Sequence, residues 1–217
     1  MKQELSIMIN SLIERYPELE SCRQAVLKTF DIIRYCYMNN AKVLICGNGG
    51  SAADAEHIVG ELMKGFMLKR RLDSNSVERL KASYPEDWRY LSDHLQGALP
   101  AISLVSHTAL SSAYSNDVAA EMFFAQQVYG YGRQGDVLLG LSTSGNSKNV
   151  VNAIKVAKAF GIKCIGFTGE NGGILGAICD VAIKVPSNET FRIQEYHLPV
   201  YHTLCAMLEE TFFGLNG

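Results

Sequence analysis

The order of hydrophobic and polar residues along the chain changes between a helical period and short apolar runs. In residues 21–39, one helical face is made of Val26, Phe30, Ile33 and Tyr37. Their spacings of 4, 3 and 4 are those of an amphipathic helix. Residues 41–47 instead form an apolar run that ends in glycine, and similar runs recur at 100–106, 136–143, 163–169 and 181–186. Such runs are typical of buried parallel strands, so the sequence predicts five strands.

Segments with helical spacing lie between the predicted strands. They cover 51–68, 117–130, 146–160, about 172–178 and about 190–213. Gly161 stands where the C-cap glycine of the helix at 146–160 belongs. Strands that alternate with helices of this length predict right-handed βαβ crossovers and a parallel sheet covered on both faces. No internal repeat or low-complexity linker interrupts the pattern, so we expect one α/β domain over residues 1–217.

Two helical segments lie outside this alternation. Residues 1–39 are helical before the first strand, which predicts an N-terminal helical arm of the kind that often mediates oligomerisation. Residues 70–99 carry an apolar stripe, interrupted near Pro85, that consists of Val77, Leu80, Tyr84, Trp88, Leu91 and Leu95. This stripe predicts an amphipathic helix or helix pair. Packing against a neighbouring helix or subunit is the favoured interpretation, and a flap over the active site is the alternative.

Composition narrows the class of protein. The 217 residues carry 20 basic and 22 acidic side chains, for a formal net charge of −2, and 47% of them are apolar. The near-neutral charge argues against nucleic acid as the main ligand, and the apolar fraction excludes a disordered or collagen-like chain. The first residues, MKQELSIMIN, are too polar for a signal peptide, and no apolar run reaches membrane-spanning length. The six cysteines lie far apart without a C-x-x-C pair, which predicts reduced structural thiols in a cytoplasmic protein.

Two polar loops follow predicted strands, at the edge where open parallel sheets bind ligands. Residues 47–51 read Gly-Asn-Gly-Gly-Ser and lead into a helix, whose N-terminus favours an anion, although glycine-rich turns of this kind are common. Residues 142–147 read Ser-Thr-Ser-Gly-Asn-Ser and open another helix. Either an ordinary serine N-cap or a neutral phosphate-binding cradle explains this loop, and the density of hydroxyl groups favours the cradle.

Two predicted helices carry side chains suited to proton transfer or metal binding. His57 and Glu61 are four residues apart and project from one helical face. Gln194 and His202 are eight residues apart on the last helix and share a face within about 80°. An imidazole and a carboxylate can bind a divalent metal or transfer a proton, but this spacing is also common in ordinary ion pairs.

All these motifs occur together in one order: C-G-N-G-G-S-A-A-D-A-x-H-x-x-x-E-L, N-D, G-D-V-L-L-G-x-S-T-S-G-N-S and R-I-Q-E-x-H-x-x-x-x-H. In this combination the chain resembles the sugar isomerase (SIS) domain family and, within it, the phosphoheptose isomerase branch, which the His-x-x-x-Glu and Gln-x7-His pairs mark. The resemblance covers nearly the whole chain and is interrupted only by a helical insertion at residues 70–99. It implies a flavodoxin-like three-layer sandwich around a five-stranded parallel sheet, assembled as a homotetramer with active sites at the subunit interfaces.

The resemblance also implies roles for individual residues. The catalytic glutamate falls on Glu61 and the catalytic histidine on His202. The Zn²⁺ ligands of zinc-containing members fall on His57, Glu61, Gln194 and His202. Substrate contacts are implied for Asn48, Gly49, Gly50, Ser51, Glu61, Asn116, Asp117, Ser142, Thr143, Ser144, Ser147 and Gln194, with the serines of the second loop on the phosphate.

The implied reaction is the conversion of D-sedoheptulose 7-phosphate to D-glycero-D-manno-heptose 7-phosphate through an enediol(ate), for the synthesis of nucleotide-activated heptose. A carboxylate such as Glu61 can take the carbon-bound proton, and an imidazole such as His202 can open the sugar ring or move the proton between the two oxygens. Zn²⁺ would polarise the carbonyl. Two alternatives stay open: a non-catalytic SIS-domain protein that associates with a replication initiator, and a sugar-phosphate sensor. Relatives of the first kind lack the glutamate and the second histidine, which are both present here.

The chain departs from the family pattern in two places. Many members carry an acidic residue just before the Arg-Ile-Gln-Glu stretch, whereas Phe191 precedes Arg192 here and Glu189 is the nearest acid. The insertion begins with a basic cluster made of Lys64, Lys69, Arg70 and Arg71. These side chains could reach a phosphate, but a solvated basic edge is the favoured interpretation.

Overall fold

A single parallel sheet forms the centre of the computed structural model, which describes residues 3–214. Its strands are β1 (Val43–Cys46), β2 (Ala101–Ser103), β3 (Val137–Leu141), β4 (Lys163–Thr168) and β5 (Val181–Lys184). They lie in the order β2-β1-β3-β4-β5, and every neighbouring pair is parallel. This is the flavodoxin-like order, in which the direction of winding reverses between β1 and β3. The five predicted strands are confirmed.

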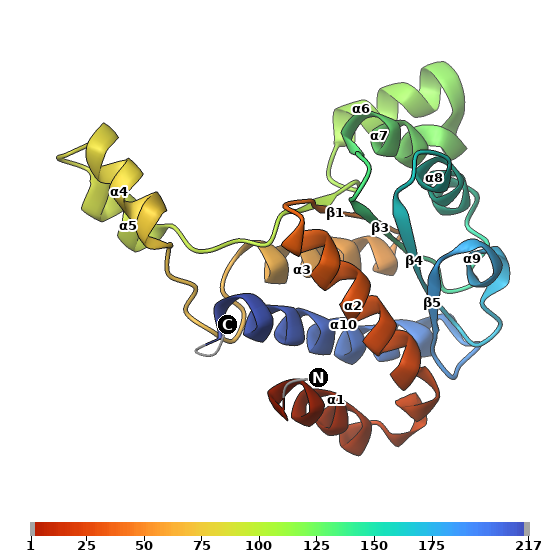
Figure 1. Cartoon of the computed structure of the whole chain (residues 1–217). Coiled ribbons are helices and arrows are strands. Elements are labelled where there is room, and N and C mark those ends of the chain that lie inside the picture. Colours follow the sequence, from red (N-terminus) through yellow and green to blue (C-terminus); the bar gives the residue numbers. More distant parts are fainter. Residues whose placement is uncertain (1–2, 215–217) are drawn as a thin grey trace.

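Helices cover both faces of the sheet. Successive residues of a strand point to opposite sides, and all four residues of β1 are buried, so both faces need a covering layer. Val43 and Ile45 belong to the core shared with α2 (Arg23–Met38), α3 (Gly50–Met63) and α10 (Thr190–Phe213). Leu44 and Cys46 belong to the core shared with α7 (Phe123–Tyr131), α8 (Lys148–Ala159) and α9 (Gly173–Ile178). The first helix, α1 (Gln3–Arg15), packs on α10 and adds a layer outside it (Figure 1). The predicted sandwich and the N-terminal helices are therefore present.

Four helical segments differ from the sequence pattern. A short 3-10 helix, η1 (Pro17–Cys22), separates α1 from α2. The helix predicted at 51–68 ends at Met63, where Lys64 is extended. The helix predicted at 117–130 begins instead with a π-helical turn, η2 (Ser115–Ala119), and a 3-10 turn, η3 (Ala120–Met122), before α7. An unpredicted helix, α6 (Thr108–Tyr114), precedes them, and none of its residues is buried.

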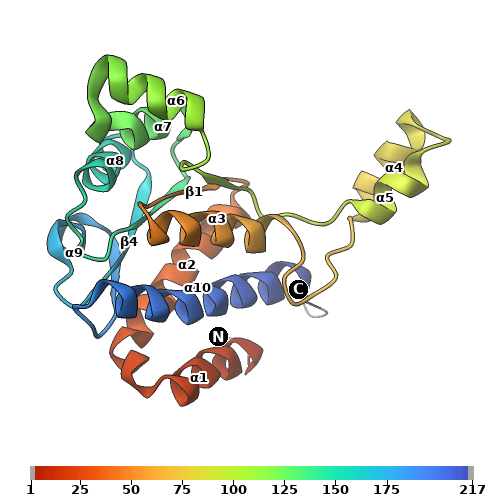
Figure 2. The same cartoon turned by 180° about the vertical axis from the view of Figure 1, so that it is seen from behind.

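The insertion forms a helical hairpin of α4 (Ser74–Ser83) and α5 (Trp88–His94), so the predicted interruption near Pro85 is confirmed. The hairpin projects away from the rest of the chain on two extended connections (Figures 1 and 2). Neither helix contains a buried residue. Within one chain the hairpin is therefore not a flap over the helices α3 and α10.

Among residues 3–214, no helix is both long enough and apolar enough to cross a bilayer. The six cysteines are free thiols, and five of them are buried.

Candidate active site

The two polar loops meet where the winding of the sheet reverses. The glycine loop follows β1 and the serine loop follows β3, and these strands are neighbours. Asn48 of the glycine loop and Asn149 in the first turn of α8 exchange two side-chain hydrogen bonds, each 2.9 Å long. Because this is the position at which open α/β sheets bind ligands, the two loops form one candidate binding site. Asn149 is a residue that the sequence analysis missed.

The serine loop is held in one conformation by its own polar groups. The Oγ atoms of Ser142 and Ser147 lie 2.9 Å apart, and the Ser144 Oγ accepts a hydrogen bond from the Asn146 N–H at 3.2 Å. Gly145 has φ 68° and lies against the backbone of Gly172, so no larger residue fits there without strain. The hydroxyl groups are thus gathered around the start of α8.

The N-cap residues of α3 and α8 do not cap their helices with a side chain. Gly49, at the N-cap of α3, has no side chain, and the Ser147 hydroxyl, at the N-cap of α8, bonds no free N–H of its helix. Ser147 is therefore not the ordinary capping serine of the alternative interpretation, since its hydroxyl faces Ser142. In the first turn of α8 the Val150 N–H bonds the Asn149 Oδ1 at 3.0 Å, and the N–H groups left free at the two helix N-termini suit a phosphate dianion.

Helices α3 and α10 start at the same edge and run side by side in the same direction (Figure 1). Gly50 at the start of α3 faces Gln194, and a Cβ at position 50 would lie 2.5 Å from the Gln194 Nε2. Seven residues further along α3, His57 meets Tyr201 and His202. The absence of a side chain at Gly50 therefore allows the close contact that aligns the two helices.

Three of the predicted catalytic and metal-binding side chains come together between these helices. The Nε2 of His57 lies 3.2 Å from the Glu61 Oε1 and 3.4 Å from the His202 Nε2. The second carboxylate oxygen of Glu61, Oε2, is buried without a hydrogen-bond partner, and the Lys64 Nζ lies 3.6 Å from it. Burial and the neighbouring His57 lower the pKa of His202. The cluster thus offers a free carboxylate oxygen and a neutral imidazole, which are a base and a proton carrier.

The donor atoms of this cluster fit Zn²⁺ in their chemistry. Tetrahedral zinc holds nitrogen and oxygen ligands at about 2.0–2.1 Å, which places neighbouring donors about 3.3 Å apart. The separations of 3.2 Å and 3.4 Å around the His57 Nε2 match that edge length. Across residues 3–214, however, no group of three or more His, Cys, Asp or Glu side chains closes around one point. Binding by all four residues would require the Gln194 side chain to turn away from Gly50.

Two residues that the sequence analysis missed hold His57 from behind. The Oη of Tyr201 lies 2.9 Å from the His57 Nδ1 and donates a hydrogen bond to the Asp54 Oδ1 at 3.3 Å. Asp54 is one helical turn before His57, a spacing that the sequence displays. Tyr201 gave no signal, because an apolar position next to His202 is what core packing predicts.

A buried ion pair anchors the end of α3 behind the cluster. The Arg70 Nε donates to the Glu209 Oε1 at 2.7 Å, and its other nitrogens donate to the carbonyl oxygens of Leu62 and Glu61 at 2.6 Å and 2.7 Å. The Glu209 carboxylate also accepts the N–H groups of residues 66–68. Although burial opposes ionisation of Glu209, these N–H donors and Arg70 lower its pKa. The sequence analysis favoured a solvated basic edge at the start of the insertion. That prediction is wrong for Arg70, which is only 2% exposed.

Other predicted site residues lie apart from the cluster. Asn116 and Asp117 are exposed in the π-helical turn and bond each other at 2.8 Å. Within residues 3–214, no hydrogen bond joins Asn116 or Asp117 to the serine loop or to His57. Glu189 precedes α10 and lies 3.9 Å from Arg192.

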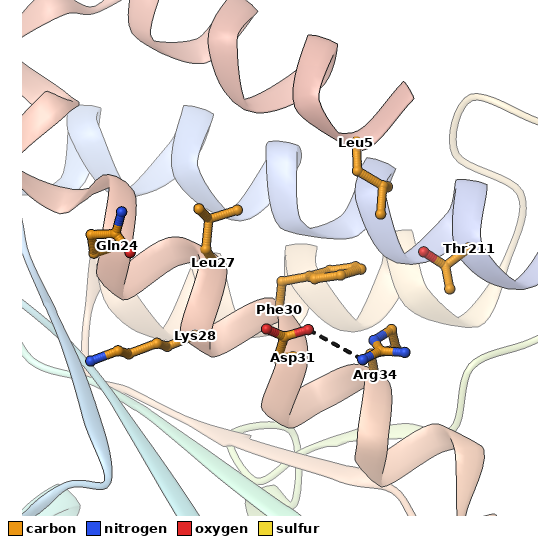
Figure 3. A pocket seen from close by; sticks show the side chains of 8 residues that line it. All are labelled: Leu5, Gln24, Leu27, Lys28, Phe30, Asp31, Arg34 and Thr211. Carbon is orange, nitrogen blue, oxygen red and sulfur yellow. Dashed lines mark hydrogen bonds and ion pairs between the residues drawn. The ribbon is translucent and has the colours of Figure 1, made fainter. Parts of the chain in front are cut away.

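A pocket of about 360 Å³ opens beside His202. It lies between α1, α10 and the segment after α3, and it is lined by Ile7, Met8, Ser11, Arg15, Phe66, Met67, His202, Thr203 and Ala206. A larger groove of about 540 Å³ runs between α1, α2 and α10 (Figure 3). That groove contains none of the predicted site residues, and its polar side chains include the Asp31–Arg34 pair. Of the predicted site residues, the smaller pocket contacts His202 alone.

Comparisons with known proteins agree with this arrangement. The model of the SIS domain matches residues 96–169. The chain is 36% identical to the phosphoheptose isomerase of Burkholderia pseudomallei over 218 residues, which covers 98% of each chain. It is 42% identical to the phosphoheptose isomerase of Nitratiruptor sp. over 174 residues, which covers 80% of this chain and 79% of the relative.

Solved structures of similar fold lead to the same group of proteins. The phosphoheptose isomerase GmhA from Neisseria gonorrhoeae superposes with a TM-score of 0.72 at 31% identity, covering 96% of this chain and 98% of that one. A phosphoheptose isomerase from Francisella tularensis superposes with a TM-score of 0.73 at 28% identity, covering 93% and 96%.

Proposed function

We propose how the residues of this chain carry out its reaction. The chain belongs to the phosphoheptose isomerase family of SIS-domain proteins and is an aldose–ketose isomerase of a sugar phosphate. The proposed substrate is D-sedoheptulose 7-phosphate, and the product is D-glycero-D-manno-heptose 7-phosphate. The observation that carries the proposal is the cluster of His57, Glu61 and His202, in which the second carboxylate oxygen of Glu61 accepts no hydrogen bond. A protein that only binds a sugar phosphate does not need a buried carboxylate oxygen without a hydrogen-bond partner.

The phosphate binds at the serine loop. Ser142, Ser144 and Ser147 supply hydroxyl groups, and the uncapped starts of α3 and α8 supply N–H groups. Asn48 and Asn149 hold the two loops together, so this part of the site is ready before substrate arrives.

Proton transfer takes place at the cluster. The Glu61 Oε2 removes the proton from C1 of the open-chain ketose, and the electron pair forms the C1–C2 double bond of an enediol(ate). The same carboxyl group returns the proton to C2, which yields the aldose. His202 carries a proton between the oxygens on C1 and C2, because its lowered pKa leaves the imidazole neutral and able to accept one. Zn²⁺ at His57, Glu61, Gln194 and His202 supplies Lewis-acid polarisation of the carbonyl when bound.

The protein is further proposed to be a cytoplasmic homotetramer with sites at its interfaces. The free cysteines support a reducing compartment. The projecting hairpin supports assembly, because its two helices contain no buried residue, and Tyr84 and Leu95 are more than half exposed. Light scattering should give four times 23.9 kDa, and a mass of 23.9 kDa would contradict the assembly.

Turnover of sedoheptulose 7-phosphate, followed by NMR with zinc supplied, tests the reaction. Glu61→Gln and His202→Ala should each lower kcat by about 10²–10⁴-fold, the usual contribution of a general acid or base. Glu14→Gln on the exposed face of α1 is the control and should leave kcat unchanged. Absence of turnover in the unmodified protein, or unchanged turnover in both variants, would refute the mechanism. Retention of a replication initiator without turnover would favour the binding-protein alternative.

A further inference from the structure

The imidazole of His57 has polar partners on both of its nitrogens. Its Nδ1 lies 2.9 Å from the Tyr201 Oη, and its Nε2 faces Glu61 and His202. Tyr201 is 1% exposed, so no solvent competes for its hydroxyl group. The positions of the protons along this chain of groups can therefore be worked out from the partners alone.

The tyrosine hydroxyl has one proton to donate. An ionised carboxylate only accepts hydrogen bonds, so the hydroxyl proton of Tyr201 points to the Asp54 Oδ1, 3.3 Å away. The oxygen lone pair of the hydroxyl then faces His57, and only a donor can satisfy it. In the neutral ring, the proton of His57 therefore sits on Nδ1.

This assignment leaves a lone pair on the Nε2 of His57. At 3.2 Å that lone pair meets a carboxylate oxygen of Glu61, and at 3.4 Å it meets the imidazole of His202. Two acceptors facing each other repel unless a cation lies between them. Metal-binding histidines commonly donate their other N–H to an oxygen that fixes the tautomer and the direction of the ring.

We propose that Tyr201 and Asp54 are positioning residues that hold His57 as the Nδ1–H tautomer and so present its Nε2 to the metal. The proposal rests on the zinc site described under the proposed function. It adds that the selection of the tautomer comes from a buried tyrosine on α10 and a carboxylate on α3. Neither residue touches the reacting atoms.

The tautomer can be observed directly in the full-length protein labelled with ¹⁵N-histidine. Long-range ¹H–¹⁵N correlations distinguish the two ring nitrogens, and the His57 signals are assigned by their loss in His57→Gln. The unmodified protein should show Nδ1–H. Tyr201→Phe and Asp54→Asn should shift the ring to a mixture or to Nε2–H. Tyr37→Phe is the matched control, because Tyr37 is 7% exposed and its hydroxyl has no hydrogen-bond partner within residues 3–214.

Zinc affinity, measured by competition with a chromophoric chelator, provides a second readout. Loss of an outer partner of a metal-binding histidine usually weakens binding 10–100-fold, and we expect a loss of that size in Tyr201→Phe. Tyr37→Phe should bind zinc like the unmodified protein. Urea unfolding of both variants separates a general loss of packing from an effect confined to His57.

The outcomes distinguish this proposal from the proposed reaction. An unchanged tautomer and unchanged zinc affinity in Tyr201→Phe and Asp54→Asn overturn the positioning role, even if the unmodified protein is an active isomerase. Absence of zinc binding by the unmodified protein overturns it as well. If both readouts shift as expected while the unmodified protein does not turn over sedoheptulose 7-phosphate, the positioning role stands and the proposed reaction fails.

Discussion

Removal of the Arg70 guanidinium should be among the most destabilising single changes in this protein. Arg70→Met keeps most of the volume of the side chain but deletes the charge that faces Glu209. Both partners are almost fully buried, at 0% and 1% side-chain exposure. The carbonyl oxygens of Glu61 and Leu62 lose their donors at the same time.

The expected magnitude follows from these contacts. Breaking one partner of a buried ion pair costs about 3–5 kcal/mol, because the remaining charge stays buried without compensation. At about 2–4 °C per kcal/mol for a chain of this length, the melting temperature should fall by about 6–20 °C. The exposed pair of Arg34 and Asp31 is the comparison, and Arg34→Met should cost less than about 1 kcal/mol.

Urea unfolding at one fixed protein concentration measures the free energy of unfolding of each variant. Glu209→Gln and the double variant with Arg70→Met complete a double-mutant cycle. Because the two side chains touch, the cost of the double variant should fall short of the sum of the single costs by about 0.5–3 kcal/mol. A cost below 1 kcal/mol for Arg70→Met, or additive costs in the cycle, would refute the assignment of the pair as the anchor of α3.

Three further predictions concern other buried or constrained groups. His197 is fully buried and its pKa is lowered to about 4, mainly by desolvation, so the unfolded chain binds its proton first. Stability should fall by roughly 3 kcal/mol as the pH drops from about 6.5 to 4, and urea titrations of His197→Leu should show a flatter dependence. Gly145→Ala should lose at least about 1 kcal/mol, because Gly145 has φ 68° and a Cβ there meets Gly172; an unchanged urea midpoint would contradict this. Ser147→Ala should raise KM for the sugar phosphate about tenfold, the value of one hydrogen bond to a charged group, and steady-state kinetics showing only a lower kcat would argue against a phosphate contact.

The elements of the fold could be predicted because their signals are local. The run at 41–47 is a buried strand, and the stripe from Val26 to Tyr37 is the buried face of α2. The role of Gly161 as the glycine that ends a helix was also predicted from the sequence, and its φ of 72° is the left-handed conformation expected there. The end of α3 was not readable, because it depends on Arg70 and on Glu209, which lies 139 residues later in the chain.

In the candidate site, too, features within one helix could be predicted from the sequence, whereas contacts between distant segments could not. His57 and Glu61 could be placed on one face from their spacing, and the structure adds His202 because α3 and α10 run in the same direction. The spacing of Gln194 and His202 predicted a shared helical face, and the resemblance implied a shared metal, which stays a prediction; the Gln194 side chain contacts Gly50. Contacts between distant segments have no local signal, and the pair of Asn48 and Asn149, 101 residues apart, is an example.

Because α3 and α10 run in the same direction, the distance along α3 between the proposed phosphate site and the His57 cluster can be compared with the length of the substrate. The phosphate cradle lies at the start of α3, and His57 follows Gly50 by seven residues, or about 10 Å at 1.5 Å per residue. In the proposed binding mode, an extended seven-carbon sugar with its phosphate at the serine loop spans this interval and brings C1 and C2 to the cluster of His57, Glu61 and His202. A triose or tetrose phosphate held by the same loop stops short of the carboxylate. The proposed binding mode therefore predicts that the length of α3 between the two ends selects against short sugar phosphates.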